Sequence, residues 1–197
     1  MPMKRAFDLI ASFFGIILAL PMLGLIALII KMKMGDPIIF RQKRVGQNGR
    51  LFTLYKFRSM SSDHNGNSVT VKGESRITPL GIFLRRYKLD ELPELWNILK
   101  GDMSFVGPRP DVPEYMNKLV GEERIILRFR PGLTSPASLK YVDEEQLVAL
   151  TNDPQGFYNK VIWPDKVRMN LEYCKNRSLL GDIILVFYTV SILLNKK

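Results

Sequence analysis

Two apolar runs stand near the ends of the chain, and between them apolar and polar residues alternate with short periods. Residues 9–30 contain no charge. As a helix they would reach about 33 Å, enough to cross a hydrocarbon core of about 30 Å. Residues 183–194 are nearly as apolar but too short to span. The pattern predicts an N-terminal membrane helix and a C-terminal helix, capped by Asp182, that is buried or interfacial.

Pro21 lies near the middle of the N-terminal run. A proline inside a helix removes a backbone hydrogen bond and clashes with the preceding turn, so a kink or break is expected. A cleaved signal peptide is disfavoured because the run is long and ends in lysines. A spanning helix and a re-entrant helix remain, and we favour the re-entrant form because basic residues flank both ends: Lys4, Arg5, Lys31 and Lys33.

The first part of the middle region resembles a hairpin followed by a loop. Residues 37–60 hold two strand-like runs on either side of Asn48-Gly49, a dipeptide typical of tight hairpin turns. Residues 61–75 are polar and rich in turn formers, which predicts a long loop. This loop carries His64, the only histidine, as a solvated side chain without a metal cluster nearby.

Two helices are predicted after this loop. Thr78 is placed to cap the first, with Pro79 at its first helical position. The second is expected to start with Asp90 as its N-cap and to end at Gly101. Its apolar residues recur at helical spacing and predict a core-facing stripe: Leu92, Leu95, Trp96 and Leu99.

Asp90 therefore has two interpretations that the residues alone leave open. In the first it only caps a helix. In the second the helix dipole keeps its carboxylate ionised and the side chain faces the gap between two helices, where phosphate can bind. A helix cap and a reactive carboxylate can also be the same residue.

Charge and cysteine content narrow the partners. Lys and Arg number 29 against 19 Asp and Glu, so the net charge is +10. Such a surface suits nucleic acid, anionic lipid or a polyanionic small substrate. The basic residues form no long run and no nucleic-acid motif occurs, so we expect anionic membrane lipids and no nucleic acid. Cys174 is the only cysteine, which excludes an intramolecular disulfide.

Arginines gather before the Asp90-Glu91 pair and in two proline-containing segments. Arginine is suited to bidentate contact with phosphate, and proline stiffens the backbone around it. Walker A, GxGxxG, CxxC and Ser/His/Asp patterns do not occur in the sequence. The candidate phosphate-binding residues are Arg85, Arg86, Arg109, Arg128 and Arg130.

Several stretches together resemble one family. The apolar N-terminal run, KFRSM, ITPLGIFLRRYKLDELPELWNILKGDMSFVGPRP and RPGLTSPASL are similar to the bacterial sugar transferases, the monotopic phosphoglycosyl transferases. The resemblance covers nearly the whole chain and its length is similar to that of small, single-domain members. It implies transfer of a phospho-sugar from a UDP-sugar to polyprenol phosphate with release of UMP, and a magnesium cofactor. It also implies a place at the cytoplasmic face of the bacterial inner membrane, where glycoconjugate assembly starts.

The resemblance also implies roles for residues. The family's dyad falls on Asp90, the nucleophile that forms a covalent aspartyl phospho-sugar, and on Glu91. Both are candidate magnesium contacts, since hard cations prefer carboxylate oxygen. The family's Lys-Phe-Arg-Ser segment adds Lys56 and Arg58 to the candidate substrate-binding residues. Two segments depart from the family's pattern. This chain has Leu20-Pro21 where the family usually has Ser-Pro. After Pro131-Gly132 it has Leu133-Thr134-Ser135-Pro136 where the family usually has Thr-Gly-Trp.

The whole sequence predicts an α+β protein, mainly helical and membrane-associated, with a small β-hairpin. Residues 1–34 are expected to form the re-entrant membrane helix, and residues 35–197 a cytoplasmic catalytic domain with interfacial helices. Two alternatives compete with phosphoglycosyl transfer. One is a membrane-bound glycosyltransferase that releases UDP, and the other is a basic membrane adaptor without chemistry. The sequence does not name the sugar.

Overall fold

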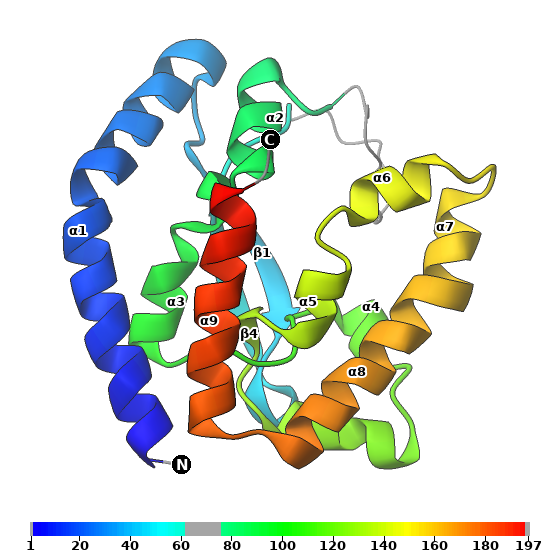
Figure 1. Cartoon of the computed structure of the whole chain (residues 1–197). Helices are drawn as coiled ribbons and strands as arrows, with labels where there is room; N and C mark the ends of the chain where they lie inside the picture. The colour runs from blue at the N-terminus through cyan, green and yellow to red at the C-terminus, as the bar shows by residue number, and fades with distance from the viewer. Residues whose placement is uncertain (1, 62–75, 196–197) are drawn as a thin grey trace.

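Short helices and two small sheets pack beside one long N-terminal helix in the computed structural model (Figure 1), which describes residues 2–61 and 76–195. The α+β class and the mainly helical composition are confirmed, while His64 lies outside the described residues. The strands are β1 (Ile39–Val45), β2 (Leu51–Phe57), β3 (Ser104–Val106) and β4 (Gly132–Thr134). The helical elements are α1 (Pro2–Met34), η1 (Gln47–Gly49), α2 (Pro79–Arg86), η2 (Leu89–Glu91), α3 (Glu94–Lys100), α4 (Pro113–Met116), η3 (Gly121–Arg128), α5 (Pro136–Lys140), α6 (Glu144–Ala149), α7 (Pro154–Phe157), η4 (Tyr158–Ile162), α8 (Trp163–Asn176) and α9 (Leu179–Leu194).

The long helix α1 continues through Pro21 without interruption, and its axis bends along its length (Figure 1). Within the described residues it is the one helix that is long and apolar enough to cross a membrane by length and composition. The structure thus shows one bent helix where two helices separated by a break were expected. The re-entrant topology, and with it the division at residue 34, stays a prediction.

Polar side chains fix the N-terminal end of α1 to the rest of the protein. Asp8 is buried, and its Oδ1 accepts hydrogen bonds from the hydroxyl of Ser104 at 3.1 Å and the backbone N–H of Phe105 at 3.2 Å. Lys4 forms an ion pair with Asp182 of α9. The beginning of the chain is therefore held in place by buried polar contacts, although most of α1 is apolar.

Helix α9 begins earlier than predicted. Its N-cap is Ser178, whose hydroxyl accepts a hydrogen bond from the backbone N–H of Gly181 at 3.0 Å. The prediction that Asp182 caps α9 is wrong, because this carboxylate is buried against other elements. Its Oδ1 accepts from the Tyr173 hydroxyl at 2.7 Å, and its other oxygen pairs with Lys4. Local capping rules could not reveal these long-range partners.

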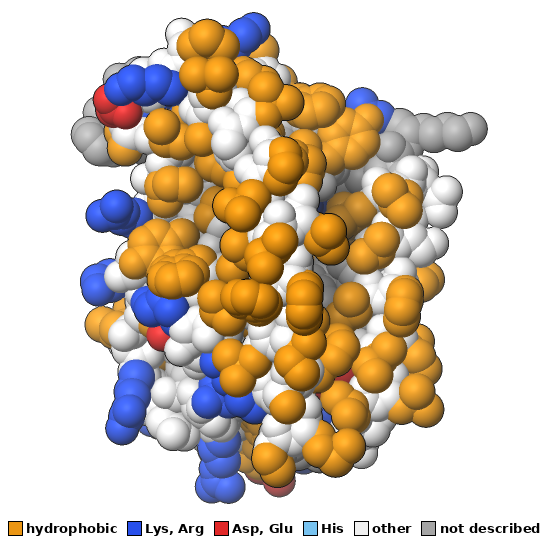
Figure 2. All heavy atoms as spheres, turned by 90° about the vertical axis from the view of Figure 1, so that its left-hand side faces the viewer, with side chains coloured by type: hydrophobic (Ala, Val, Ile, Leu, Met, Phe, Trp, Pro, Cys, Tyr) orange, Lys and Arg blue, Asp and Glu red, His pale blue; other side chains and the backbone are white. Residues whose placement is uncertain are grey.

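Exposed apolar side chains cover the outer sides of α1 and α9 (Figure 2). A contiguous apolar surface of this kind is unusual on a soluble monomer and typical of a protein- or membrane-binding face. We call it the apolar face. Its members include Ile10, Phe14, Leu18 and Leu25 of α1 and Leu180, Ile184 and Phe187 of α9.

The predicted hairpin is confirmed. Strands β1 and β2 pair antiparallel, with Ile39 opposite Phe57 and Val45 opposite Leu51. The turn places Asn48 and Gly49 at positive φ, 57° and 76°, a conformation that these two residue types tolerate best. The hairpin places Lys56, near the end of β2, beside Glu91.

A second sheet, which the sequence did not predict, joins β3 and β4 in parallel. Ser104 lies opposite Gly132 and Val106 opposite Thr134. The two backbones approach so closely that a Cβ on Gly132 would lie 2.0 Å from the backbone nitrogen of Gly107. Glycine is therefore required at this contact. Pairs of three-residue strands are too short for a period-2 pattern to show.

The start of α2 follows its prediction, but that of α3 does not. Thr78 caps α2 by accepting from the Gly81 N–H at 2.9 Å. Lys88 then takes the left-handed conformation with φ 55°, and a 3₁₀ turn holds Asp90. Helix α3 begins only at Glu94, so Asp90 is not its N-cap.

The predicted core-facing stripe of α3 is only partly correct. Trp96 is 51% exposed, whereas the buried residues of the helix are Glu94, Leu95, Asn97 and Ile98. The buried face includes Asn97 because its side chain completes the edge of β2. Its Nδ2 donates to the Thr53 carbonyl at 2.7 Å, and its Oδ1 accepts from the Tyr55 N–H at 3.1 Å.

Candidate active site

The end of β2, the 3₁₀ turn η2 and the loop after β3 meet at Glu91. Its Oε1 lies 2.8 Å from Nζ of Lys56 and 2.6 Å from Nη2 of Arg109. Lys88 Nζ lies 4.0 Å away. Lys56 also forms an ion pair with Glu94 at 3.1 Å. The structure thus brings together Lys56, Arg109 and Glu91, which the sequence named from three separate segments.

The cations determine the protonation of Glu91. Burial alone would raise the pKa of this carboxyl, but the charges of Arg109, Lys56 and Lys88 outweigh burial and hold its pKa well below the usual range. In return, the Glu91 charge raises the pKa of Arg109. Glu91 is therefore a fixed anion that holds two cations in place.

Asp90, the adjacent residue, is in the opposite situation. It is buried, with 5% of its surface exposed, and its Oδ1 accepts no hydrogen bond from any described residue. Burial and the nearby Glu91 charge raise its pKa, and Lys56, Lys88 and Arg85 only partly offset them. Asp90 does not lie at the N-terminus of α3, so the predicted stabilisation of its ionised form by the dipole of that helix is absent. Two adjacent carboxyls with pKa values moved apart suit different chemical roles.

Asp90 and Glu91 border an open cavity of about 1450 Å³, which we call the dyad cavity. Its lining is mixed. The charged side chains described above line it together with apolar side chains of α5 and α9, including Ala137, Leu139, Val186, Val190 and Leu193. The cavity can therefore receive a molecule with a polyanionic end and a hydrocarbon end.

Arg85 and Arg86 also line the dyad cavity. The Arg85 guanidinium forms an ion pair with Glu145 of α6. Arg86 is exposed, and its guanidinium carbon lies 5.7 Å from the centroid of the Tyr87 ring. Both cations are near the dyad, as predicted. They are less buried than Lys56 and can turn toward a ligand.

Arg58 lines the same cavity, but its guanidinium is engaged with the end of α1. Nη1 donates to the Asp36 carbonyl at 2.8 Å, and Nη2 donates to the carbonyls of Gly35, at 2.7 Å, and Met34. A cation at a helix C-terminus is favoured by the helix dipole. Arg58 therefore joins the last turn of α1 to the wall of the cavity.

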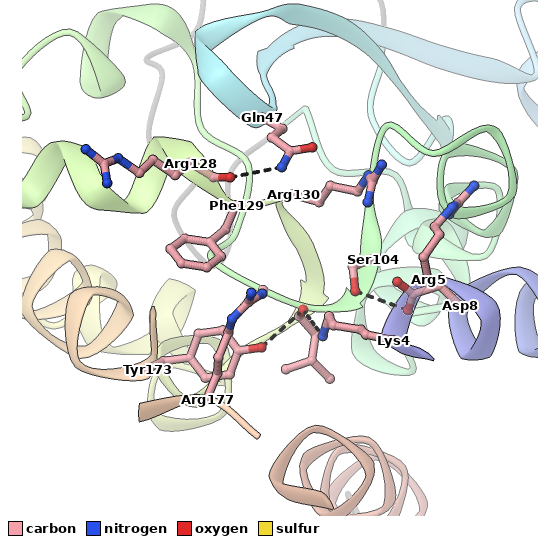
Figure 3. A pocket seen from close by; sticks show the side chains of 12 residues that line it. Lys4, Arg5, Asp8, Gln47, Ser104, Arg128, Phe129, Arg130, Tyr173 and Arg177 are labelled. Carbon is pink, nitrogen blue, oxygen red and sulfur yellow. Dashed lines mark hydrogen bonds between the residues drawn. The ribbon is translucent and has the colours of Figure 1, made fainter. Parts of the chain in front are cut away.

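Arg128 and Arg130 do not line the dyad cavity. They border a second, smaller cavity of about 120 Å³ near the N-terminal end of α1 (Figure 3). Arg130 donates through Nε to the Gly101 carbonyl at 2.8 Å. The Arg128 carbonyl accepts from Gln47, and its exposed guanidinium points away from the other labelled cations (Figure 3). The structure thus separates these two arginines from the other predicted phosphate-binding residues.

Several charged residues in or next to the dyad cavity were not predicted as site residues. Lys88 and Glu94 complete the charge cluster around Glu91, and Glu145 pairs with Arg85. Lys88 stands two residues before the dyad, and Glu94 stands three residues after it, which is a signal that could have been used. Glu145 lies sixty residues from its partner, and no local pattern indicates this contact.

No group of three or more His, Cys, Asp or Glu side chains is placed to hold a metal within residues 2–61 and 76–195. The dyad offers less than a full ligand set. Asp90 has a buried oxygen without a hydrogen-bond partner among the described side chains, whereas Glu91 already holds two cations. Magnesium often binds through one or two carboxylates together with substrate phosphates, and Asp90 fits this type of contact better than Glu91 does.

Comparison with known sequences gives a match over the whole length. The family model described as "Bacterial sugar transferase" matches residues 1–196. The undecaprenyl-phosphate glucose phosphotransferase of Komagataeibacter xylinus is 35% identical over 95% of this chain and 35% of that protein. The UDP-glucose:undecaprenyl-phosphate glucose-1-phosphate transferase of Escherichia coli K12 is 36% identical over 95% of this chain and 39% of that protein.

A shorter relative matches from end to end. The exopolysaccharide production protein PSS of Rhizobium leguminosarum is 35% identical, with 95% of this chain and 93% of that protein aligned. This chain therefore spans between one third and two fifths of the longer relatives described above and nearly all of a shorter one.

Proposed function

The chain belongs to the bacterial sugar transferase family, and on that premise we propose that it transfers a phospho-sugar from a UDP-sugar to polyprenol phosphate. The observation that carries this proposal is the dyad cavity. It places a buried carboxylate without a hydrogen-bond partner among the described residues next to several cations, and it continues along an apolar wall. The polar end suits a diphosphate, and the apolar wall suits an isoprenoid chain.

In the first proposed step, an ionised oxygen of Asp90 attacks the phosphorus that carries the sugar. The new bond joins that oxygen to phosphorus, and the bond from phosphorus to the bridging oxygen of the diphosphate breaks. UMP leaves with the bridging oxygen. In the second step, a phosphate oxygen of the polyprenol phosphate attacks the same phosphorus. The aspartyl bond breaks, Asp90 is regenerated and a polyprenyl-diphosphate-sugar forms.

The cations near the dyad stabilise charge on the transferring group. Arg109 and Lys56 are held by Glu91 before any substrate arrives, so little reorganisation is needed when the phosphates bind. Arg85 and Arg86 at the end of α2 contact the donor's remaining phosphate. Glu91 is a positioning residue in this proposal, because its carboxylate is occupied by the two cations.

Magnesium is the proposed cofactor, and the oxygens of Asp90 together with the donor's diphosphate would hold it. The bound ion would neutralise phosphate charge as it does in other phosphoryl transfers. Because Asp90 has two carboxylate oxygens, one can contact the cation while the other attacks. Full activity in excess EDTA would contradict this assignment.

The acceptor's hydrocarbon chain is proposed to follow the apolar wall of the dyad cavity along α9 toward the apolar face. This places α9 and the outer side of α1 in the bilayer, at the cytoplasmic face of the bacterial inner membrane. The proposed topology of α1 is re-entrant. Cysteines introduced near residues 2 and 35 should both be unreactive toward a periplasmic reagent in intact cells. Labelling of one of them from the periplasm would show a spanning helix instead.

The product of the donor half-reaction tests the proposed function directly. The full chain in detergent should release UMP from a UDP-sugar before acceptor is added, and should carry the radiolabelled sugar on the protein after quenching. A panel of UDP-sugars scored in the same assay identifies the sugar. Release of UDP would instead indicate a glycosyltransferase. Absence of both products with every donor would support an adaptor without chemistry.

A further inference from the structure

A second cavity, separate from the dyad cavity, collects positive charge at the N-terminal end of α1. We call it the basic cavity. It has a volume of about 120 Å³ and lies between α1, the segment after η3 and the junction of α8 with α9. Figure 3 shows Lys4, Arg130 and Arg177 projecting from these three separate segments around it. Arg5 of α1 also lines it.

Five cations line the basic cavity, and the Arg128 guanidinium points away from the other labelled ones (Figure 3). Two of the five, Lys4 and Arg5, are satisfied by the protein itself. Lys4 pairs with Asp182 and donates to the Val106 carbonyl at 2.9 Å. Arg5 donates to two carbonyls at the end of α3, those of Ile98 at 2.7 Å and Leu99 at 2.9 Å. These two residues hold α1 in place, and Lys4 is the ion-pair partner of the buried carboxylate of Asp182 on α9.

The remaining two cations, Arg130 and Arg177, have no carboxylate partner among the described residues. Arg130 uses only Nε, which donates to the Gly101 carbonyl, and its two terminal nitrogens make no hydrogen bond to a described residue. The Arg177 guanidinium lies 4.3 Å from the centroid of the Phe129 ring and makes no hydrogen bond within the described chain. Both side chains belong to half-buried residues. Among the described residues, Asp8 is the only carboxylate that lines the cavity, and it already accepts from Ser104 and Phe105.

Two half-buried guanidiniums without anionic partners in a small cavity are the arrangement that recognises a phosphate group. The volume of the cavity is enough for one such group and too small for a sugar nucleotide. The cavity also borders the apolar face, because Met3 precedes Lys4 and Leu180 follows Arg177 by three residues, and both apolar side chains are largely exposed.

We propose that the basic cavity binds the phosphate of an anionic phospholipid headgroup through Arg130 and Arg177. The acyl chains of that lipid would then lie along the adjacent apolar residues of α1 and α9. This site is distinct from the proposed acceptor site, because neither Asp90 nor Glu91 lines it. The proposal therefore stands or falls independently of the phosphoryl-transfer function.

The test is calorimetric titration of the full chain in uncharged detergent with short-chain phosphatidylglycerol, with short-chain diacylglycerol as a probe that lacks phosphate. The wild type should bind the phospholipid saturably and should not bind the diacylglycerol in the same way. Arg130→Gln and Arg177→Gln should each weaken binding by about tenfold, the loss expected for one charge-assisted hydrogen bond.

Matched variants separate a specific site from general basicity. Arg124→Gln removes the same charge from exposed residue 124 of η3, which does not line the cavity, and should bind as the wild type does. Arg177→Lys keeps the charge and should retain most of the affinity. The comparison with Arg177→Gln then shows that the loss comes from the missing charge and not from misfolding. Equal losses in all three glutamine variants, or no loss in any of them, would overturn the proposal.

A parallel titration with inorganic phosphate distinguishes the source of the phosphate. If only the phospholipid binds with the predicted variant pattern, the ligand is a headgroup. If inorganic phosphate binds with that pattern and the phospholipid does not, the cavity is a site for free phosphate and the lipid assignment is wrong.

Discussion

The dyad cavity and the basic cavity lie on either side of β3 and use their positive charges differently. Along this strand, Phe105 lines the dyad cavity, whereas Ser104 and Val106 line the basic cavity, as alternation in a strand requires. In the dyad cavity, Lys56 and Arg109 are already paired with carboxylates. In the basic cavity, two arginines have no carboxylate partner among the described residues.

The difference indicates what each cavity is suited to do. Prearranged ion pairs hold cations at fixed positions, which favours catalysis because charge is stabilised without reorganisation. Cations without carboxylate partners favour binding, because an incoming anion does not have to displace an internal one. Beside these ion pairs in the dyad cavity, the buried Oδ1 of Asp90 has no hydrogen-bond partner among the described residues.

The largest expected effect is that of Asp90→Ala. If this carboxylate is the nucleophile, the change should lower donor turnover by on the order of 10⁴-fold and abolish the covalent label on the protein. The measurement is UMP release from the UDP-sugar. Glu122→Ala removes an exposed carboxylate paired only with Lys175, and it should leave turnover unchanged. A labelled, active Asp90→Ala protein would show that Asp90 is not the nucleophile.

The next largest effect is expected for Glu91→Gln. Loss of this charge leaves Lys56 and Arg109 without their shared anion, so we expect a loss of about 3 kcal/mol in the free energy of unfolding. Turnover should fall as well, since the cations are no longer held in place. Denaturant titration measures the first effect. If stability is unchanged and only turnover falls, Glu91 acts on the substrate or on magnesium and not through the two cations.

A smaller effect, of opposite sign, is expected for Asp90→Asn. Burial and the Glu91 charge raise the pKa of Asp90, so the native state holds this proton more tightly than the unfolded chain does. Between the unfolded pKa, about 3.9, and the higher native pKa, ionisation lowers the stability of the wild type as pH rises. The variant cannot ionise there.

The Asp90→Asn protein should therefore melt at a higher temperature than the wild type near neutral pH, although it should lose activity if Asp90 is the nucleophile. The difference should disappear below about pH 4, where Asp90 is protonated in both states. Thermal melting across this pH range is the measurement. Glu91 gives the opposite sign, because its pKa is depressed and its stabilisation is lost as pH falls.

The smallest effect is expected in the wall of the dyad cavity next to β3. The hydroxyls of Thr134 on β4 and Thr189 on α9 lie 2.8 Å apart. Thr134→Val removes this hydrogen bond and should cost about 1 kcal/mol of stability. Phosphatidylglycerol binding in the basic cavity should not change. A change in lipid affinity would mean that the wall couples the two cavities.

Local sequence signals predicted the parts of this structure that local physics determines. Asn48-Gly49 fixes the hairpin and Thr78-Pro79 fixes the start of α2, because each depends on a few adjacent residues. Lys56 and Arg109 were named as site residues, and the structure places both next to Glu91. Their pairing with Glu91 was not predicted, since the three residues lie on separate elements.

Some side chains contact segments that their neighbours in sequence do not indicate. The capping role predicted for Asp182 is wrong for this reason, whereas the binding roles of Arg58 and Arg130 stay predictions, although both contact distant segments as well. Arg58 holds the end of α1, Asp182 pairs with Lys4, and Arg130 lies beside the N-terminal end of α1. Charged side chains contact partners that are distant in sequence, and a local sequence pattern does not indicate such partners. These contacts therefore depend on the tertiary fold.

The ion pair between Lys4 and Asp182 has a consequence for biosynthesis. Its partners lie 178 residues apart in the sequence, so during translation the first turn of α1 is made long before α9 exists. Until the last helix leaves the ribosome, Lys4 has no buried carboxylate to meet. Pairing of Lys4 with Asp182 must therefore be one of the final folding events, as is usual for contacts of large sequence separation. In a newly made chain, the ion pair that joins the two apolar helices is therefore still missing.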